Sequence, residues 1–404
     1  MTRTAASLAT GPFGQNWPSV AVKHLAVFQS GSAIDGEEIE DFGTYPVYGG
    51  NGLRGYAERF THKGEFVLVG RQGALCGNIN YAEGHFWASE HALVGHPRRM
   101  FDRQWFGEVL RTANLGQFST AAAQPGIAAE VVNNLRIPVP SVETQRLIAR
   151  FLDRETGLID GLIEKKTRFI ALLKEKRAAV ITHAVTKGID PDAPMKDSGV
   201  DWLGHVPAHW DVVPPTALFT ESKERAREGD QMLSATQKYG VIPLAEYEAL
   251  EQRQVTMAVV NLNMRKHVEV GDFVISMRSM DGGLERARAV GSVRSSYSVL
   301  KPGPDVEGRF YGALMKSSLY IQALRLTSNF IRDGQDLNFG HVRKVKLPKP
   351  DLREQAAIAD HIEAETARID GLISLTERSI DLLREKRAAL ITAAVTGKID
   401  VRAA

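Results

Sequence analysis

The sequence predicts an α+β protein in which two mixed, β-rich blocks are separated by two long antiparallel coiled-coil helices, with pseudo-twofold symmetry. Three observations support this prediction: a 53-residue internal repeat, a heptad pattern in each copy of the repeat, and a glycine-rich block before each copy. A chain of 404 residues is long enough for several domains of about 100–200 residues each. The order is therefore block, helix, block, helix.

The internal repeat is the strongest of these signals. Residues 138–190 align without a gap to residues 348–400, at a constant offset of 210 positions, and 28 of the 53 paired residues are identical. The closest matches are Ile-Asp-Gly-Leu-Ile, which begins at Ile159 and Ile369, and Glu-Lys-Arg-Ala-Ala, which begins at Glu175 and Glu385. Self-similarity of this kind indicates two copies of one supersecondary unit.

Both copies have the spacing of a coiled-coil helix, because seam residues alternate at intervals of four and three over about four heptads. The apolar seam residues are Ile159, Ile163, Ile170, Leu173 and Val180 in the first copy, and Ile369, Ile373, Ile380, Leu383 and Leu390 in the second. Lys166 and Arg177 interrupt the first seam, and Thr376 and Arg387 interrupt the second at the same two places. Polar seam residues weaken a coiled coil but fix its register.

A second apolar stripe lies off the seam and could face the core or a partner helix. It consists of Leu162, Phe169, Leu172, Leu372 and Leu382. The helices could therefore be an intramolecular strut alone, or a strut that also docks a partner. Gly157 interrupts the first copy and allows a short helix near 142–154 to be separate from the long one.

The two blocks share a faint frame although their sequences differ. Residues 64–71 align with residues 271–278, and each block then has a helix-like stretch, at 105–111 and 311–324, before a final strand that leads into prolines. The predicted parts are a disordered tail at 1–15, a first block at 16–140, a first helical region at 141–190, a linker at 191–207, a second block at 208–350 and a second helical region at 351–404.

Composition excludes several classes of protein. The single cysteine, Cys76, rules out an internal disulfide and a cysteine-based zinc site, and no metal site is predicted. With no long apolar run and no signal peptide, we expect a cytoplasmic protein that does not enter a membrane. A net charge of +2 permits nucleic-acid binding if the basic residues gather on one face.

No catalytic constellation is visible, so no catalytic residue is predicted. There is no phosphate-binding loop of the kind found in ATP-driven motors. A DNA amino-methyltransferase would need a Pro-Pro-aromatic loop to hold its target base, but the pair Pro214 and Pro215 is followed by Thr216.

Two further strings point to a family. They are Tyr-Pro-Val-Tyr-Gly-Gly-Asn-Gly at 45–52, and Asp-Ser-Gly-Val-Asp-Trp-Leu-Gly-His-Val-Pro-Ala-His-Trp at 197–210. Together with the helical repeat and its Glu-Lys-Arg-Ala-Ala and Val-Thr matches, the ordered set resembles the specificity subunits of type I restriction–modification enzymes over nearly the whole chain. The resemblance implies that the blocks are target-recognition domains, each reading a few base pairs, and that the helical regions are spacers that dock methyltransferase subunits.

The function implied is that of a non-catalytic adaptor, which reads a split, asymmetric target in double-stranded DNA. Its partners would be two methyltransferase subunits and restriction or translocase subunits. S-adenosylmethionine, ATP and magnesium would bind to those partners, and no cofactor to this chain. Two other functions remain open: a coiled-coil scaffold that reads no DNA, and a self-contained DNA methyltransferase with unfamiliar motifs.

Candidate DNA contacts follow from the chemistry of base reading, in which Arg or Lys recognises guanine and Asn or Gln recognises adenine. In the first block the candidates are Tyr48, Gly49, Gly50, Asn51, Arg54, Arg71, Gln72, Ser89 and His91. In the second block they are Ser234, Thr236, Gln237, Lys238, Tyr239, Ser276, Arg278, Ser279, Arg332, Gln335 and Asn338. The plain alternative for each group is an ordinary turn or a solvated polar face.

Overall fold

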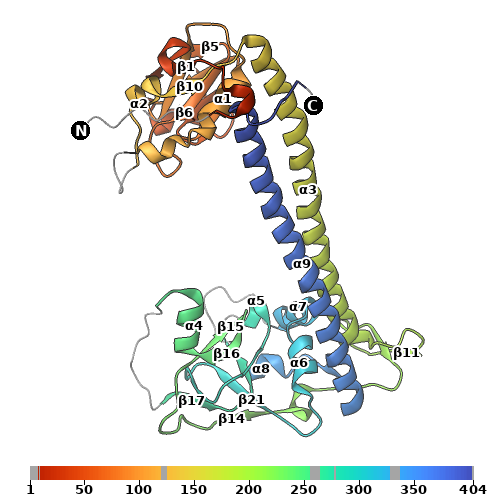
Figure 1. The fold of residues 1–404 in the computed structure, drawn as a ribbon. Helices are drawn as coiled ribbons and strands as arrows, with labels where there is room; N and C mark the ends of the chain where they lie inside the picture. The colour runs from red at the N-terminus through yellow and green to blue at the C-terminus, as the bar shows by residue number, and fades with distance from the viewer. Residues whose placement is uncertain are drawn as a thin grey trace. The chain divides into compact units, whose positions relative to one another are not determined.

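The fold is taken from a computed structural model, which describes residue 8 and residues 10–119, 125–254, 264–276, 279–327 and 337–402 (Figure 1). Residues 1–7 and 9 of the predicted tail at 1–15 lie outside the described residues. Disorder is wrong for residues 11–14, because Pro12–Gly14 is a short 3-10 helix and the Gly11 amide donates to the Thr396 carbonyl at 2.9 Å. The chain forms two compact units, Met1–Thr167 with Glu377–Ala404, and Arg168–Thr376. Each unit contains one β-rich block and a part of each long helix, as the α+β prediction requires.

The first block is built on two four-stranded sheets. One is antiparallel, in the order β2 (Ala26–Ser30), β9 (Ala92–Pro97), β6 (Phe66–Gly70) and β7 (Ile79–Ala82). The other has the order β4 (Gly52–Ala57), β3 (Tyr45–Gly49), β8 (His85–Ala88) and β5 (His62–Lys63), and its β3–β8 pair is parallel. The remaining elements are β1 (Ser19–Ala21) paired with β10 (Arg136–Pro138), and the helices α1 (Arg103–Thr112) and α2 (Ala129–Asn134).

The second block repeats the first antiparallel sheet with different residues. Its order is β14 (Phe219–Ser222), β21 (Ser298–Pro302), β18 (Phe273–Ile275) and β19 (Glu285–Arg286), so that β18 stands where β6 stands in the first block. The faint alignment of 64–71 with 271–278 therefore reflects a shared strand. The other strand pairs are β11 (Met195–Asp197) with β12 (His205–Pro207), β13 (Asp211–Val213) with β22 (Leu347–Lys349), β15 (Leu233–Thr236) with β16 (Gly240–Pro243), and β17 (Lys266–Val268) with β20 (Gly291–Val293).

The helices of the second block are α4 (Leu244–Glu251), α5 (Ser279–Gly282), α6 (Gly308–Leu314), α7 (Ser318–Thr327) and α8 (Phe339–Val342). The helix-like stretch expected at 311–324 is thus divided between α6 and α7. Ser317 causes the division, because its hydroxyl donates to the carbonyl of Leu314 at 2.7 Å, while the Tyr320 amide donates back to it at 3.4 Å. A serine that bonds to local backbone in this way ends one helix and begins the next.

The two repeat copies form the long helices α3 (Val142–Lys187, 46 residues) and α9 (Leu352–Val395, 44 residues). The prediction of a separate short helix near 142–154 is wrong, since α3 passes through Gly157 without a break. Glycine inside a helix costs only about 1 kcal/mol relative to alanine. The apolar residues Leu152 and Ile159, buried on either side of it, offset a cost of that size.

Within each unit the two helices run antiparallel. In the first unit, Ile148 and Leu152 of α3 share a core with Ile391 and Val395 of α9, and Asp160 of α3 pairs with Arg387. Residue numbers along α3 therefore increase in the direction in which residue numbers along α9 decrease. The second unit has the same relation, because Val185 shares a core with Ile358 while Arg177 pairs with Asp370.

An identical glutamine joins each block to its long helix. The Gln145 side chain is buried; its amide donates to the Pro140 carbonyl at 2.9 Å, and its oxygen accepts from the Asp102 amide at 2.9 Å. Gln355, at the equivalent position of the repeat, donates to the Pro350 carbonyl at 2.8 Å and accepts from the Glu307 amide at 2.8 Å. Asp102 and Glu307 are the N-caps of α1 and α6, so each glutamine connects the start of a long helix to the start of a helix in its block.

Candidate nucleic-acid interface

In the first unit, three separate loops line one open hollow of about 490 Å³. They are the turn between β3 and β4, the loop after β6, and the loop between β8 and β9. The lining residues are Gly49, Gly50, Asn51, Gly52, Leu53, Arg54, Gln72, Gly73 and His91. Most of the residues predicted in this block as DNA contacts are therefore brought together, although they are far apart in sequence.

Glycines are required where the turn meets the loop after β6. A Cβ on Gly50 would lie 2.7 Å from the carbonyl oxygen of Gln72, and a Cβ on Gly70 would lie 2.2 Å from the carbonyl oxygen of Gly50. Gly52 has a φ of +98°, which favours glycine. The backbone of the turn thus packs directly against the loop that carries Gln72, and this contact shapes the hollow.

Arg54 and Asn51 supply exposed polar groups at the rim of the hollow. In the part of the chain that the structure describes, the Arg54 guanidinium forms no ion pair or hydrogen bond. Arg71 differs, because its guanidinium donates to the Ser30 hydroxyl at 2.9 Å and to the Glu90 carbonyl at 3.3 Å. Arg54 is therefore the cation best placed to meet a phosphate or a base, while Arg71 holds neighbouring strands together.

Gln72 and His91 face each other across the hollow and contact directly. The Nδ1 atom of His91 lies 2.8 Å from Oε1 of Gln72, and its Nε2 atom lies 3.2 Å from Oε1 of Glu90. Sequence reasoning found Gln72 and His91 but missed Glu90, which adjoins both Ser89 and His91. The adjacency of a carboxylate and a histidine was the available signal.

Two first-block candidates have structural roles in this conformation. Ser89 is fully buried, and its hydroxyl accepts from the His91 amide at 3.3 Å, so its proposed direct contact with DNA is corrected to support of the His91 loop. Tyr48 is half-buried and its ring packs edge-on against Phe86, with ring centroids 5.6 Å apart. Burial, followed by the charge of Glu83, raises the pKa of Tyr48, so this phenol stays neutral.

In the second unit, the candidates on the β15–β16 hairpin lie near one another. The Thr236 hydroxyl donates to the Gly240 carbonyl at 3.0 Å, and Ser234 is half-buried in β15. Lys238 and Tyr239 both contact Glu251 of α4, at 3.4 Å and 2.8 Å. Gln237 is exposed at the tip of the hairpin. This hairpin presents polar groups, but intramolecular contacts already engage most of them.

Of the remaining second-block candidates, the structure describes Ser276, Ser279 and Asn338. Ser276 and Ser279 are buried, with the Ser276 amide donating to the Ser279 hydroxyl at 3.0 Å, so direct DNA contact through them is corrected to closure of a turn. Asn338 is exposed and caps α8 by accepting from the Gly340 amide at 2.8 Å. Arg278, Arg332 and Gln335 lie outside the described residues.

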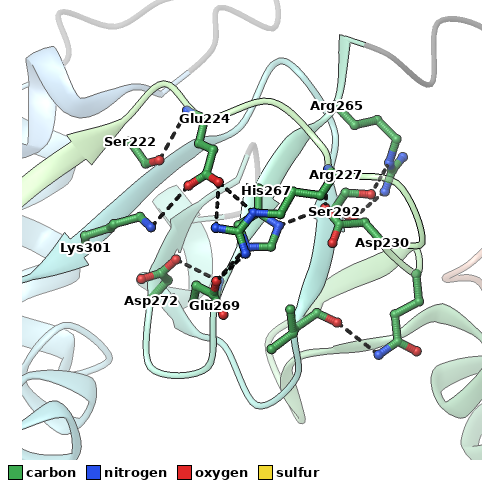
Figure 2. A network of polar contacts seen from close by, with 12 residues as sticks. Ser222, Glu224, Arg227, Asp230, Arg265, His267, Glu269, Asp272, Ser292 and Lys301 are labelled. Carbon is green, nitrogen blue, oxygen red and sulfur yellow. Dashed lines mark hydrogen bonds and ion pairs between the residues drawn. The ribbon is translucent and has the colours of Figure 1, made fainter.

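Instead, the second block contains a network of charges centred on the buried side chain of His267 (Figure 2). The imidazole is inaccessible to solvent, and its two nitrogens lie 2.8 Å from Asp230 and 2.8 Å from Glu269. Arg227 donates to Glu269 at 2.8 Å and to Glu224 at 2.7 Å. Burial alone would lower the pKa of His267, but the hydrogen bonds to Asp230 and Glu269 outweigh it and raise the pKa.

Sequence reasoning missed this network. His267 occurs in a short strand between Lys266 and Val268, and nothing local shows that its side chain points inward. Among the described residues, no group of three or more histidine, cysteine or acidic side chains is arranged to hold a metal ion. The described helices also include none that is both long and apolar enough to cross a membrane.

The long helices separate two kinds of apolar residue. The apolar seam residues are all buried or half-buried: Ile159, Ile163, Ile170, Leu173, Val180, Ile369, Ile373, Ile380, Leu383 and Leu390. The second stripe is exposed instead, with exposed fractions of 48% for Leu162, 45% for Phe169, 52% for Leu172, 40% for Leu372 and 65% for Leu382. The stripe was expected to face either the core or a partner helix. Because its residues are exposed, the expectation that it faces the chain's own core is wrong.

Comparison with known proteins identifies the first block. Residues 14–168 match the family described as the type I restriction modification DNA specificity domain. This part of the chain is therefore similar to a type I restriction–modification DNA specificity domain. This confirms the resemblance seen in the sequence.

Individual relatives agree with this family. Over 32% of its length the chain is 41% identical to the type I restriction enzyme EcoprrI specificity subunit of Escherichia coli, and this match spans only 32% of that protein. The type I restriction enzyme MjaVIII specificity subunit of Methanocaldococcus jannaschii is 22% identical over 96% of this chain and 94% of its own.

Solved structures show the same fold. One of these chains comes from a structure that describes the complex assembly and conformational transition of the type I R-M system. It has a TM-score of 0.67 at 14% sequence identity, and the match covers 96% of this chain and 99% of that chain. The HsdS subunit from Thermoanaerobacter tengcongensis has a TM-score of 0.53, also at 14% identity, over 96% of this chain and 98% of its own. The α+β architecture with two blocks and two long helices is therefore shared with these proteins.

Proposed function

We propose that this chain is the DNA-specificity subunit of a type I restriction–modification system. It reads a split, asymmetric target in double-stranded DNA and performs no catalysis itself. Two methyltransferase subunits and restriction subunits assemble on it. Those partners bind S-adenosylmethionine, ATP and magnesium, and they carry out methylation and cleavage.

The observation that carries this proposal is the hollow of the first block. Three loops bring Asn51, Arg54, Gln72 and His91 together inside a DNA specificity domain. Arginine, asparagine and glutamine are the side chains that form two-pronged hydrogen bonds with base edges in the major groove. An open hollow lined by such groups suits a projecting base edge or phosphate better than an enclosed small molecule.

The exposed stripe on the long helices supports the proposed partners. Leu162 and Leu372 are equivalent in the repeat, and both remain exposed while the seam beside them is buried. The same holds for the equivalent pair Leu172 and Leu382. Two equivalent apolar surfaces on one chain fit two copies of one partner, because exposed apolar side chains gathered on a surface favour protein contacts.

The test is to map DNA methylation by single-molecule sequencing in cells that express this chain with the methyltransferase encoded beside it. We expect a split motif with a fixed gap and two different half-sites. A soluble complex that adds no methylation would favour the scaffold function instead. Methylation by the purified chain alone, with DNA and S-adenosylmethionine, would favour the self-contained methyltransferase.

A further inference from the structure

His91 lies between two oxygen atoms that both require a donor. Its Nδ1 is 2.8 Å from Oε1 of Gln72, and its Nε2 is 3.2 Å from Oε1 of Glu90. The other carboxylate oxygen of Glu90, Oε2, is buried and has no hydrogen-bond partner among the described residues. His91 is therefore the group that faces the Glu90 charge. A neutral imidazole has one N–H and one lone pair, so it cannot donate to both oxygens at once.

The Gln72 amide is the part of this trio that can adapt. With a proton on Nδ1, the imidazole donates to Oε1 of Gln72, and the NH₂ group of Gln72 is left for the hollow. With the proton on Nε2 instead, the imidazole faces the Glu90 carboxylate as a donor, because a carboxylate only accepts. Nδ1 then accepts, and the Gln72 amide must turn by half a rotation to donate to it. This rotation would leave Oε1 of Gln72 for the hollow.

We propose that Gln72 reads one base pair of the target, and that Glu90 and His91 are positioning residues that set whether Gln72 offers a donor or an acceptor. This inference rests on the proposed DNA-reading function. In the observed arrangement Gln72 offers its NH₂ group. Its partner is then a base with a major-groove acceptor, such as N7 or O6 of guanine, rather than the amino group of cytosine.

The immediate surroundings fit this assignment. Gln72 and His91 both line the hollow, which is the space that DNA would enter. The backbone on either side is fixed, because the Gly73 amide donates to the Pro125 carbonyl at 3.0 Å and the Arg71 amide donates to the His91 carbonyl at 2.8 Å. A reading group held on rigid backbone loses little freedom on binding, which favours specificity.

The test uses the complex with its methyltransferase subunits. Its affinity is measured for duplexes in which each position of the mapped motif carries all four base pairs in turn. Gln72→Glu has only acceptor oxygens. It is expected to shift the preference at one position towards adenine or cytosine, whose amino groups donate, by about 5- to 150-fold relative to the wild type. Gln15→Glu, at an exposed glutamine outside the hollow, adds the same charge and is expected to leave the preference unchanged.

Variants of the other two residues test the positioning role. Glu90→Gln can donate or accept, and His91→Phe can do neither, so both are expected to flatten the preference at the Gln72 position while other positions stay within about twofold. Gln72→Met, which keeps the size of the side chain, is expected to flatten it too. The melting temperature of each variant shows whether the fold is intact.

The possible results distinguish a failure of this inference from a failure of the proposed function on which it rests. If the wild-type complex has no sequence preference, the proposed function fails and this inference fails with it. If the wild type reads a motif that Gln72→Glu and Gln72→Met leave unchanged, only the inference fails. Equal losses at every position with a lower melting temperature, or an effect of Glu90→Gln at a different position from that of Gln72, would also overturn it.

Discussion

The two blocks have the same scaffold but place their polar side chains differently. Strand β6 of the first block and β18 of the second hold the same place in equivalent sheets. After β6 the chain presents Gln72 to an open hollow, whereas after β18 it turns inward and buries Ser276. The second block also forms a charged network around the buried His267, and the described residues of the first block have no equivalent of it.

This difference shows which parts of the chain the repeat constrains. Repeated residues such as Gln145 and Gln355 make the same backbone contacts in both units. The loops that follow the equivalent strands are not repeated, and their chemistry differs. This combination suits the proposed reading of two different half-sites, in which the two surfaces must differ while the parts that hold them stay alike.

The largest expected effect comes from the glutamine that joins each block to its helix. Gln145→Ala and Gln355→Ala should each lower the free energy of unfolding by about 2–4 kcal/mol, since each change leaves a buried donor and acceptor unpaired and opens a cavity. Denaturant unfolding of the full chain measures both. Strongly unequal losses would show that the two joints are less alike than their contacts.

The next effect concerns the exposed cation of the first block. Arg54→Ala should weaken DNA binding by the assembled complex by about tenfold and reduce the slope of log affinity against log salt by about one, if Arg54 meets a phosphate. Arg99→Ala, at an exposed arginine outside the hollow, is the matched control. An unchanged affinity for Arg54→Ala would remove this residue from the interface.

Histidines of the two blocks should respond to pH in opposite directions. The raised pKa of His267 means that its contribution to stability is complete below about pH 6.5 and is lost as pH rises through the folded-state pKa. Burial lowers the pKa values of His62 and His96, so their contribution is complete above about pH 6.5 and is lost as pH falls below it.

Variants measured against pH check this contrast. The loss of stability in His267→Gln should be greater at pH 5.5 than at pH 8. In His62→Gln the loss of stability should be smaller at pH 5.5 than at pH 8. At pH 5.5 the wild-type fold is itself destabilised, because a partly buried histidine must be protonated. The same pH trend in both variants would contradict the contrast between the blocks.

The smallest effect is expected from the two symmetric ion pairs between the long helices. Arg177 pairs with Asp370 at 3.0 Å, and Arg387 with Asp160 at 2.9 Å, with all four side chains partly exposed. Removing either arginine should cost about 1 kcal/mol or less. A double-mutant cycle for each pair gives the coupling energy, and a large coupling in one pair alone would break the symmetry.

These ion pairs also show how far sequence reasoning reaches. A repeat and a heptad spacing were enough to place α3 and the start of α9 to within a few residues, because periodic burial is a local property of a helix. The second helical region was expected to reach residue 404, whereas α9 ends at Val395. The arginines looked like interruptions of the seam. Their partners, Asp160 and Asp370, come from the other helix, 227 and 193 positions away in sequence, and no local pattern reveals such a pairing.

The candidate site follows the same rule. Residue type and turn signals identified Asn51, Arg54, Gln72 and His91, and the fold brings them to one hollow. The same reasoning failed for Ser89, Ser276 and Ser279, because a serine that caps a turn and one that meets DNA look alike in sequence. Burial separates the two roles, and burial depends on strand pairings that residue spacing does not fix.

The joint at Gln145 and Gln355 has a consequence for how such chains change over time. From the block, both glutamines contact backbone groups and no side chain. Gln145 accepts from the Asp102 amide, whereas Gln355 accepts from the Glu307 amide and also donates to the Asp305 carbonyl at 3.1 Å. A block of unrelated sequence would fit the same joint if it offered one amide at the start of a helix. Recombination between genes could therefore exchange whole blocks at this junction, and a lineage could acquire a new target in one step without rebuilding its helices.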